Sequence, residues 1–244
     1  MKQKKIFIYG KHAVSEALRH APQLLRTVYL SPLMKDKEIL SLINRANIKT
    51  EKLDPRKATS QVEGNAPHQG IIALMSVFGL ALPFEDFIKD FNPAGSLLVY
   101  LDGIQDPHNV GAIIRAAAAF GASGVLLPGH GQSPITAAVI KASAGAVFSV
   151  PLVSVTNTQQ TLAELRRKGV AVYGLAGGGS SIVKEEFTKP TLFILGNEST
   201  GISPAARAVC DKMLEIPISK KVESLNVASA ATAALYAWSS KNSS

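Results

Sequence analysis

The sequence has little cysteine and no long apolar runs. Cys210 is the one cysteine among 244 residues, which excludes a disulfide framework and a cysteine-based zinc site within one chain. A reducing cytoplasm is the setting such a composition favours. The apolar run at 6–9 is too short for a signal peptide, and no run reaches the ~20 residues of a membrane helix. We therefore expect a cytoplasmic protein that does not span a membrane.

Several common catalytic patterns are also missing. The chain has no G-x-x-x-x-G-K-[ST] phosphate loop, no G-x-G-x-x-G turn after the first strand of its α/β part and no G-x-S-x-G elbow. Its five histidines lack metal-ligand spacing, so we expect no metal site. The glycine-rich run at 174–181 could cradle an anion, but no helix with a basic residue clearly follows it. A flexible loop is therefore favoured there.

The positive charge lies mainly in the first third of the chain. The net charge is +8, and residues 1–77 hold 13 Lys and Arg against 6 Asp and Glu. The remaining residues are close to neutral. A basic module beside a near-neutral one indicates a part that grips a polyanion such as RNA, although basic charge that serves solubility alone is the alternative.

The first third predicts a small α/β unit. Helical spacing and β-branched residues place its elements, and Asp54 before Pro55 is typical of a helix start. The expected helices are 11–19 and 35–46, and the expected strands are 25–30, 48–53 and 70–78. A break with two prolines and a short helix follows at 78–94. We expect this break to link a substrate-binding domain at 1–77 to a catalytic domain at 95–244.

From Ser96 onward, apolar strands alternate with helices. The expected strands are 97–101, 124–127, 147–155, 170–175, 191–195 and 213–216, and the expected helices are 109–120, 135–144, 159–168, 203–210 and 222–238. This alternation predicts an α/β fold with a mainly parallel sheet covered on both faces. Ligands bind such sheets at the carboxyl ends of strands. The turns after Leu101, Leu195 and Ile216 are therefore the candidate site.

The turn after Leu101 leads into a helix that Asn109 can cap. Arg115 is a single arginine on this alanine-rich helix, which ends at Gly121 as a C-terminal cap. Two interpretations of Arg115 stay open from the residues alone. It is either a surface side chain that extends past alanines or a ligand for an anion or a ribose.

The two later turns carry further polar residues. After Leu195, Gly196 and Gly201 allow a close approach of backbone to a ligand, and Glu198 adds a carboxylate. After Ile216, Ser224 and Asn226 precede a long helix. Taken alone, these last two residues are best explained as simple helix caps.

Together the three segments resemble the SpoU ribose 2′-O-methyltransferases of the SPOUT superfamily. The motifs that carry the resemblance are Asn109-x-Gly111-x-x-x-Arg115, Leu195-Gly196-Asn197-Glu198-x-x-Gly201, and Ile216-Pro217-Ile218 with Ser224-Leu225-Asn226-Val227. The run at 8–14 also resembles the start of the substrate-binding domain in the branch of 23S rRNA guanosine 2′-O-methyltransferases. The resemblance thus spans essentially the whole chain. Ala116 departs from it, since many members carry Ser or Thr there.

The resemblance implies a fold, a reaction and a set of partners. The fold would carry a C-terminal trefoil knot, which general topology rules alone would exclude. The reaction would be S-adenosylmethionine-dependent methylation of a ribose 2′-hydroxyl in structured RNA, a guanosine of 23S rRNA. No metal would be needed. The enzyme would be a homodimer with the knot region in the interface, where one subunit can complete the site of the other.

The resemblance also implies site residues. The catalytic set carried over by motif is Arg115, Asn109, Glu198, Ser224 and Asn226. The cofactor-binding set, which would act mainly through backbone groups, is Gly196, Ile216, Leu225, Leu195 and Asn197. Arg115 is often drawn as the base in this family. Because arginine stays protonated in proteins, we expect it instead to engage the target phosphate or ribose and lower the pKa of the hydroxyl.

Candidate phosphate contacts lie in the basic first third of the chain. They are Lys11, Arg19, Arg26, Lys35 and Arg45. Two other functions remain open. One is methylation of tRNA by the same catalytic domain, and the other is a non-catalytic RNA-binding or ribosome-assembly factor built on this fold.

Overall fold

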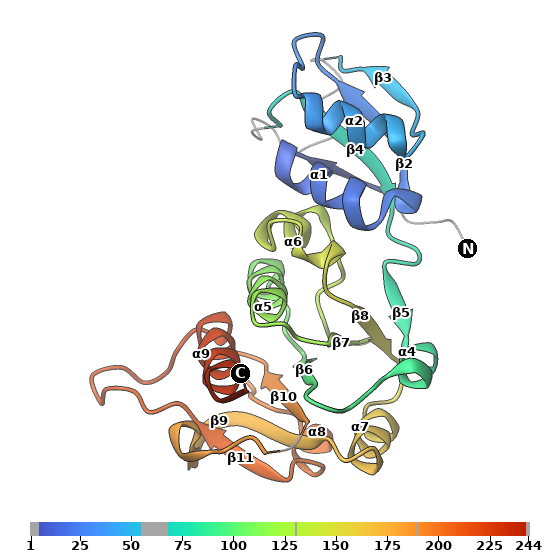
Figure 1. Ribbon diagram of the computed structural model, residues 1–244. Coiled ribbons are helices and arrows are strands. Elements are labelled where there is room, and N and C mark those ends of the chain that lie inside the picture. Colours follow the sequence, from blue (N-terminus) through green and yellow to red (C-terminus); the bar gives the residue numbers. More distant parts are fainter. Residues whose placement is uncertain (1–4, 55–67, 130, 189, 243–244) are drawn as a thin grey trace.

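The computed structural model describes residues 5–54, 68–129, 131–188 and 190–242. These residues form two β-sheets, each with its own helices, stacked along the long axis of the molecule (Figure 1). The helix expected to start at Asp54 and Pro55 lies outside the described residues, which stop at Asp54 and resume at residue 68. No helix of the described residues is both long and apolar enough to cross a membrane.

The small sheet has the strand order β1-β4-β2-β3. Its strands are β1 (Lys5–Tyr9), β2 (Leu25–Leu30), β3 (Thr50–Lys52) and β4 (Ile71–Ser76). In β4, Ile71, Ala73 and Met75 are fully buried in the main core. Helices α1 (Lys11–His20) and α2 (Lys37–Arg45) pack in the same core and contact each other. Alternate side chains of β4 thus bury one face of the sheet under both helices.

The large sheet is parallel throughout, with the order β11-β9-β10-β6-β7-β8-β5. Its strands are β5 (Ala81–Pro83), β6 (Leu97–Asp102), β7 (Gly124–Pro128), β8 (Leu152–Val155), β9 (Ala171–Ser181), β10 (Thr191–Gly196) and β11 (Lys212–Glu215). Residues 97–101 of the central strand β6 are fully buried. The predicted α/β class with a mainly parallel sheet is therefore confirmed.

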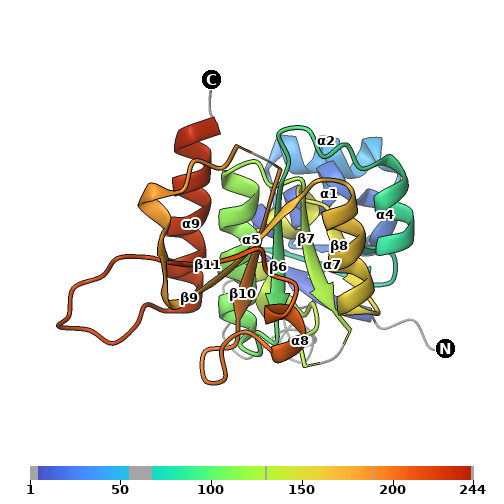
Figure 2. The same ribbon diagram turned by 90° about the horizontal axis from the view of Figure 1, so that it is seen from below.

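Helices cover both faces of the large sheet (Figure 2). One core contains Leu97, Val99 and Leu101 of β6 and packs against α5 (Pro107–Ala119), α6 (Ala137–Ala142) and α9 (Val227–Asn242). The other contains Leu98 and Tyr100 and packs against α4 (Phe84–Asp90), α7 (Thr158–Arg167) and α8 (Pro204–Arg207). The alternation of side chains along one strand therefore supplies both cores.

The two sheets are joined by direct packing. The Lys141 ammonium in α6 lies 5.4 Å from the centre of the Tyr9 ring at the end of β1. Gly145 has a φ of +82°, and a Cβ there would lie 2.8 Å from Cβ of Glu16 in α1. A glycine at 145 is therefore needed both for the backbone conformation and for the close approach of α1.

Much of the segment expected as a linker belongs to the large-sheet unit, as strand β5 and helix α4. Strand β5 pairs with β8 in parallel, and Phe84 of α4 is buried in the core beneath α7. The reason is that β5 forms backbone hydrogen bonds with β8, and the aromatic side chains of α4 bury apolar surface against the same strand. The chain thus crosses to the second unit before residue 84.

Two other expectations about elements are wrong. The run at 147–155, expected as one strand, is a 3-10 turn at Ala146–Phe148 followed by β8. Pro151 has no N–H to donate and stands directly before that strand. The run at 174–181, expected as a flexible loop, belongs to β9. There a Cβ at Gly179 would lie 2.6 Å from the Met213 carbonyl oxygen, so glycine lets β11 pack closely.

Candidate active site

The three candidate turns meet at one edge of the large sheet. They follow β6, β10 and β11, whose carboxyl ends share that edge because the strands are parallel. Asn197 Nδ2 donates to the Gly103 carbonyl at 2.8 Å, and the Ser203 N–H donates to Asp102 Oδ2 at 2.6 Å. The turns after β6 and β10 are therefore bound directly to each other.

Asn109 does not cap its helix, which corrects the expectation from sequence. Asp106 is the N-cap of α5, since its side chain accepts from the His108 N–H at 2.8 Å and Pro107 follows as the first helical residue. A proline at that position is already set for the helix. The cap therefore falls three residues earlier than expected, and the Asn109 side chain is left available for other partners.

Asn109 links the other two turns. Its Nδ2 donates to Glu198 Oε1 at 2.6 Å, and its Oδ1 accepts from Asn226 Nδ2 at 3.0 Å. Asn226 Oδ1 caps α9 by accepting from the Ala228 and Ser229 N–H groups at 2.9 and 3.3 Å. This cap fixes which end of the Asn226 amide faces Asn109. We call Glu198, Asn109 and Asn226 the amide bridge.

The turn after β10 is tightly packed and internally hydrogen-bonded. A Cβ at Gly196 would lie 2.4 Å from backbone atoms of Gly201 and Ile202, so a side chain cannot be placed there without moving the loop. The backbones of Asn197 and Gly201 exchange two hydrogen bonds of 3.0 and 2.9 Å. Asn197 Oδ1 also accepts hydrogen bonds from the N–H groups of Ser199 and Thr200, two and three residues further on. The Asn197 side chain therefore organises the loop.

The turn after β11 is long and extends away from the sheet (Figures 1 and 2). Ile216 is half-buried, and residues 217–226 are exposed. Leu225 is 40% exposed. Ser224 makes no hydrogen bond with any other described residue, so only Asn226 of the two expected caps acts as one. Helix α9 accordingly begins at Val227 and not at 222 as expected.

Arg115 lies apart from the amide bridge. It is exposed on α5 and makes no hydrogen bond or ion pair within the described part of the chain. It follows Asn109 by six residues, which rotates it about 120° around the helix axis at ~100° per residue. The structure therefore brings together Asn109, Glu198 and Asn226 but leaves Arg115 and Ser224 outside that cluster.

Two residues that support the site were missed from the sequence. Asp102 accepts from the Ser203 N–H, and Gln132 Oε1 accepts from the Ile104 N–H at 2.9 Å. The position of Asp102 at the end of an apolar strand was a usable signal. Gln132 lies in a separate turn after β7, and nothing in its neighbourhood in sequence indicated its partner.

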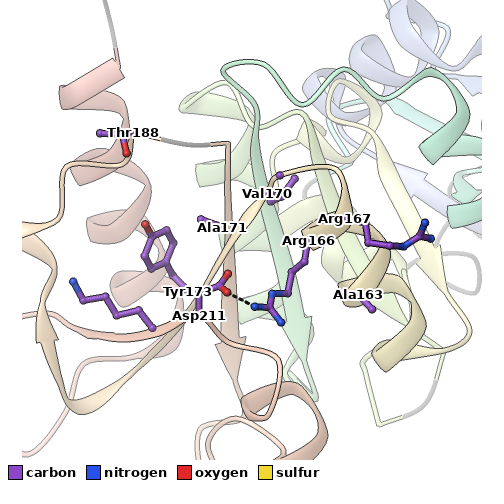
Figure 3. A pocket seen from close by; sticks show the side chains of 10 residues that line it. Ala163, Arg166, Arg167, Val170, Ala171, Tyr173, Thr188 and Asp211 are labelled. Carbon is purple, nitrogen blue, oxygen red and sulfur yellow. Dashed lines mark hydrogen bonds and ion pairs between the residues drawn. The ribbon is translucent and has the colours of Figure 1, made fainter.

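A large cavity lies at the opposite edge of the sheet, away from the three turns (Figure 3). It measures ≈ 700 Å³ and is lined by residues at the amino ends of β9 and β11. Its cations are paired, Arg166 with Asp211 at 2.6 Å and Lys212 with Glu185 at 2.7 Å. Burial raises the pKa of Tyr173, whose neutral hydroxyl donates to Glu185. These contacts describe a surface held by ion pairs rather than a vacant charged site.

Two family models match the chain. Residues 96–236 match the model described as the SpoU rRNA Methylase family. Residues 7–77 match the model described as RNA 2'-O ribose methyltransferase substrate binding. The boundary between the two matches falls in the segment that contains β5 and α4.

Individual relatives agree with these matches. The chain is 36% identical over 236 residues to the 23S rRNA (guanosine-2'-O-)-methyltransferase RlmB of Pseudomonas syringae pv. tomato, covering 94% of this chain and 93% of the relative. The SpoU methyltransferase AviRb from Streptomyces viridochromogenes, solved in complex with AdoMet, has a TM-score of 0.84 at 28% identity, covering 98% and 91%. A TrmH/SpoU tRNA modifying enzyme of A. aeolicus has a TM-score of 0.54 at 25% identity, covering 66% of this chain and 84% of that one.

Proposed function

The chain belongs to the SpoU rRNA methylase family. We therefore propose that it transfers a methyl group from S-adenosylmethionine to the ribose 2′-hydroxyl of a guanosine in 23S rRNA. The amide bridge carries this proposal. It joins Asn109, in the first turn of α5, to one residue from each of the two later turns by hydrogen bonds of 2.6 and 3.0 Å. Polar groups held in a fixed arrangement are what orientation of a ribose requires.

S-adenosylmethionine, when bound, supplies a methyl group on a positively charged sulfur. The turns after β10 and β11 suit such a group. Among the described residues, few backbone groups of 216–225 are hydrogen-bonded; the Val222 N–H, which donates to the Ser219 carbonyl, is one of them. The apolar side chains of Ile218 and Leu225 are 38% and 40% exposed. Backbone groups left for a ligand beside uncovered apolar side chains fit an adenine edge and an aliphatic chain. We assign Gly196, Ile216, Leu225, Leu195 and Asn197 to this site.

The side chains of the cofactor set have different roles under this proposal. Leu195 is 2% exposed, and the Asn197 side chain is engaged by the Gly103 carbonyl and by the Ser199 N–H of its own loop. These two residues therefore shape the turn and offer only backbone groups. Leu225 is exposed and is available for direct contact. Gly196 keeps the turn compact because no side chain fits there.

The proposed transfer would form a bond between the ribose oxygen and the methyl carbon, break the carbon–sulfur bond, and pass the hydroxyl proton to water. The electron pair of the broken bond stays on sulfur, whose charge is thereby neutralised. We assign Asn109, Glu198, Ser224 and Asn226 to positioning the ribose. Arg115 remains charged throughout, so it stabilises negative charge on the target phosphate or ribose and does not accept the proton.

The proposal includes the homodimer and the C-terminal trefoil knot of the family. The position of Arg115 supports the dimer, because this side chain points about 120° away from the amide bridge of its own chain. Arg115 of one subunit would then serve the amide bridge of the other. Residues 1–77 would bind RNA, and 95–244 would carry the reaction.

The basic side chains that are candidates for RNA binding are not equivalent. Arg19 donates to Glu16 at 2.6 Å and to Glu38 at 2.5 Å, and these hydrogen bonds raise its pKa. Its guanidinium is therefore engaged within the protein. Lys35 and Arg45 are exposed, and neither has an ion pair among the described residues, so we favour these two as phosphate contacts.

The test is to map 2′-O-methyl marks in RNA from cells with and without this protein, and to assay the purified protein on 23S rRNA and on tRNA with S-adenosylmethionine. A mark lost from a 23S rRNA guanosine, and restored by the purified protein, is the expected result. Methylation of tRNA alone would contradict the substrate. Calorimetry with no S-adenosylmethionine binding would instead favour a non-catalytic RNA-binding or assembly factor.

A further inference from the structure

A second cavity, of ≈ 540 Å³, lies in the small-sheet unit. We call it the small-sheet pocket. It is lined by Lys11, Ser31, Leu33, Met34, Lys35, Asp36, Gln69 and Gly70. Tyr9 pairs with Ile72, and Leu30 pairs with Ile71. The ends of β1 and β2 and the start of β4 therefore share one edge of the sheet, and the pocket opens there.

The walls of the pocket are fixed by backbone contacts. Ser31 N–H donates to the Gly70 carbonyl at 2.8 Å, and the Lys11 N–H donates to Gln69 Oε1 at 2.9 Å. Gln69 and Gly70 have φ angles of +51° and +80°. A Cβ at Gly70 would lie 3.1 Å from Cβ of Ser31. The turn before β4 is thus held tightly against the turn after β2.

The lining combines cationic and apolar side chains. Lys35 is exposed without an ion pair among the described residues, and Lys11 Nζ lies 3.1 Å from Asp36 Oδ2. Leu33 is 82% exposed, the largest exposed fraction among the large apolar side chains described. Gln69 Nε2 and the Ser31 hydroxyl hydrogen have no partner within the described residues. Such a set can hold a phosphate, cover a flat ring and hydrogen-bond its edge at the same time.

We propose that the small-sheet pocket binds one unstacked nucleotide of the RNA substrate, with its phosphate at Lys35 and its base against Leu33 and Met34. The volume falls in the ~300–1,000 Å³ range of small-molecule sites. Proteins that read RNA sequence take up bases from loops and bulges, where the base is free of its neighbours. This inference rests on the proposed function, since it assumes an RNA substrate.

The pocket lies beside the contact between the two units. Lys11 follows Tyr9 by two residues, and the Tyr9 ring lies under Lys141 of α6. Helix α6 packs closely on α5, the helix that carries Arg115, because a Cβ at Gly111 of α5 would lie 2.5 Å from Cβ of Ala142. A nucleotide in the pocket would therefore place the RNA next to the helices of the large sheet.

The test measures RNA binding by the full-length protein. The probes are a stem–loop transcribed from 23S rRNA and the same stem closed into an uninterrupted duplex. Leu33→Ser should weaken stem–loop binding about tenfold and leave duplex binding unchanged. Lys35→Gln should weaken binding about threefold and lower the slope of log Kd against log salt by about one. The matched controls Val183→Ser and Lys37→Gln, which lie outside the pocket, should bind as the wild type does.

Each outcome decides the proposal. Equal binding of stem–loop RNA by Leu33→Ser, Lys35→Gln and the wild type would overturn it, even if the protein methylates 23S rRNA. Equal losses in the pocket variants and in their controls would also overturn it. Conversely, the wild type could transfer no methyl group while Leu33→Ser still weakens stem–loop binding. That result would contradict only the proposed function. Thermal unfolding of each variant checks that the fold is intact.

Discussion

At the scale of single residues, Arg115 offers a planar guanidinium on an exposed helix face. A guanidinium can bind a phosphate or ribose through two parallel hydrogen bonds, whereas a lysine ammonium acts as a point charge. We predict that Arg115→Lys lowers kcat at least ~100-fold, a loss typical of a removed transition-state donor. The affinity for S-adenosylmethionine, measured by calorimetry, should not change.

Arg167→Lys is the matched control, because Arg167 lies on α7 at the far edge of the sheet and is paired with Glu164. It should turn over at the wild-type rate. Near-normal turnover of Arg115→Lys would show that the shape of the guanidinium is irrelevant, and the role given to Arg115 would be wrong.

Asn109 acts as donor and acceptor at once within the amide bridge. In Asn109→Asp the donor to Glu198 is lost, and two carboxylates face each other at a site where the present hydrogen bond is 2.6 Å long. We predict about a tenfold fall in kcat from the loss of this contact, worth ~1.4 kcal/mol. The melting temperature should change little, because the bridge is near the surface.

A second change tests that pairing directly. In Asn109→Asp with Glu198→Gln, a glutamine donor faces an aspartate acceptor, so the hydrogen bond returns with reversed polarity. Turnover should recover in part relative to Asn109→Asp. Identical rates for the single and double variants would show that the contact between positions 109 and 198 does not support catalysis.

Cys210 is half-buried, and its thiol donates to the Ala206 carbonyl. Burial raises the pKa of the thiol to about 11. Because the pKa of an unfolded cysteine is ~8.5, the folded state holds the proton more tightly, and stability is lost as pH rises from ~8.5 towards 11. We predict slow reaction with a disulfide reagent at pH 8 and fast reaction in denaturant. A native rate equal to the denatured rate would contradict the burial.

At the scale of elements, the packing of α5 on α6 depends on one glycine. A Cβ at Gly111 would lie 2.5 Å from Cβ of Ala142 and 2.7 Å from the Val139 carbonyl oxygen. We predict that Gly111→Ala destabilises the protein by about 1–3 kcal/mol, the usual cost of overpacking. Helix propensity alone predicts the opposite sign, a gain of up to ~1 kcal/mol. The free energy of unfolding in urea therefore separates the two effects.

The elements that sequence predicted well are those with long apolar or periodic runs. Strand β6 was found because all of its first five residues are buried, which leaves a continuous apolar segment. Strand β9 was missed over residues 176–181 because its glycines resemble a loop, although Gly179 lets β11 pack at close range. That contact joins residues more than thirty positions apart and has no local signature.

The candidate site was predicted in part for a related reason. The sequence indicated the turns after β6, β10 and β11, since strand ends can be read from apolar runs. It could not give the partners of Asn109, because Asp106 displaced it as the helix cap. That displacement also explains how one amide can reach both Glu198 and Asn226.

At the scale of the whole molecule, the concentration of positive charge in residues 1–77 predicts RNA binding that depends strongly on salt. If three phosphates are contacted, raising salt from ~50 to ~200 mM should weaken binding about fortyfold. Lys35→Gln with Arg45→Gln should reduce this dependence, whereas Arg167→Gln with Lys168→Gln in the large-sheet unit should not. If both pairs of substitutions gave the same slope of log Kd against log salt, the small-sheet unit would not be the main source of electrostatic RNA binding.

The separation of Arg115 from the amide bridge predicts how two subunits share one site. If Arg115 acts across a two-fold interface, every site combines the arginine of one chain with the Asn109, Glu198 and Asn226 of the other. We predict that Arg115→Ala and Asn226→Ala homodimers are both inactive. Mixed after unfolding and refolding together, they should regain about a quarter of wild-type activity, because half of the dimers are mixed and each has one intact site. If Arg115 instead serves its own chain, every site in the mixture carries one substitution and no activity returns.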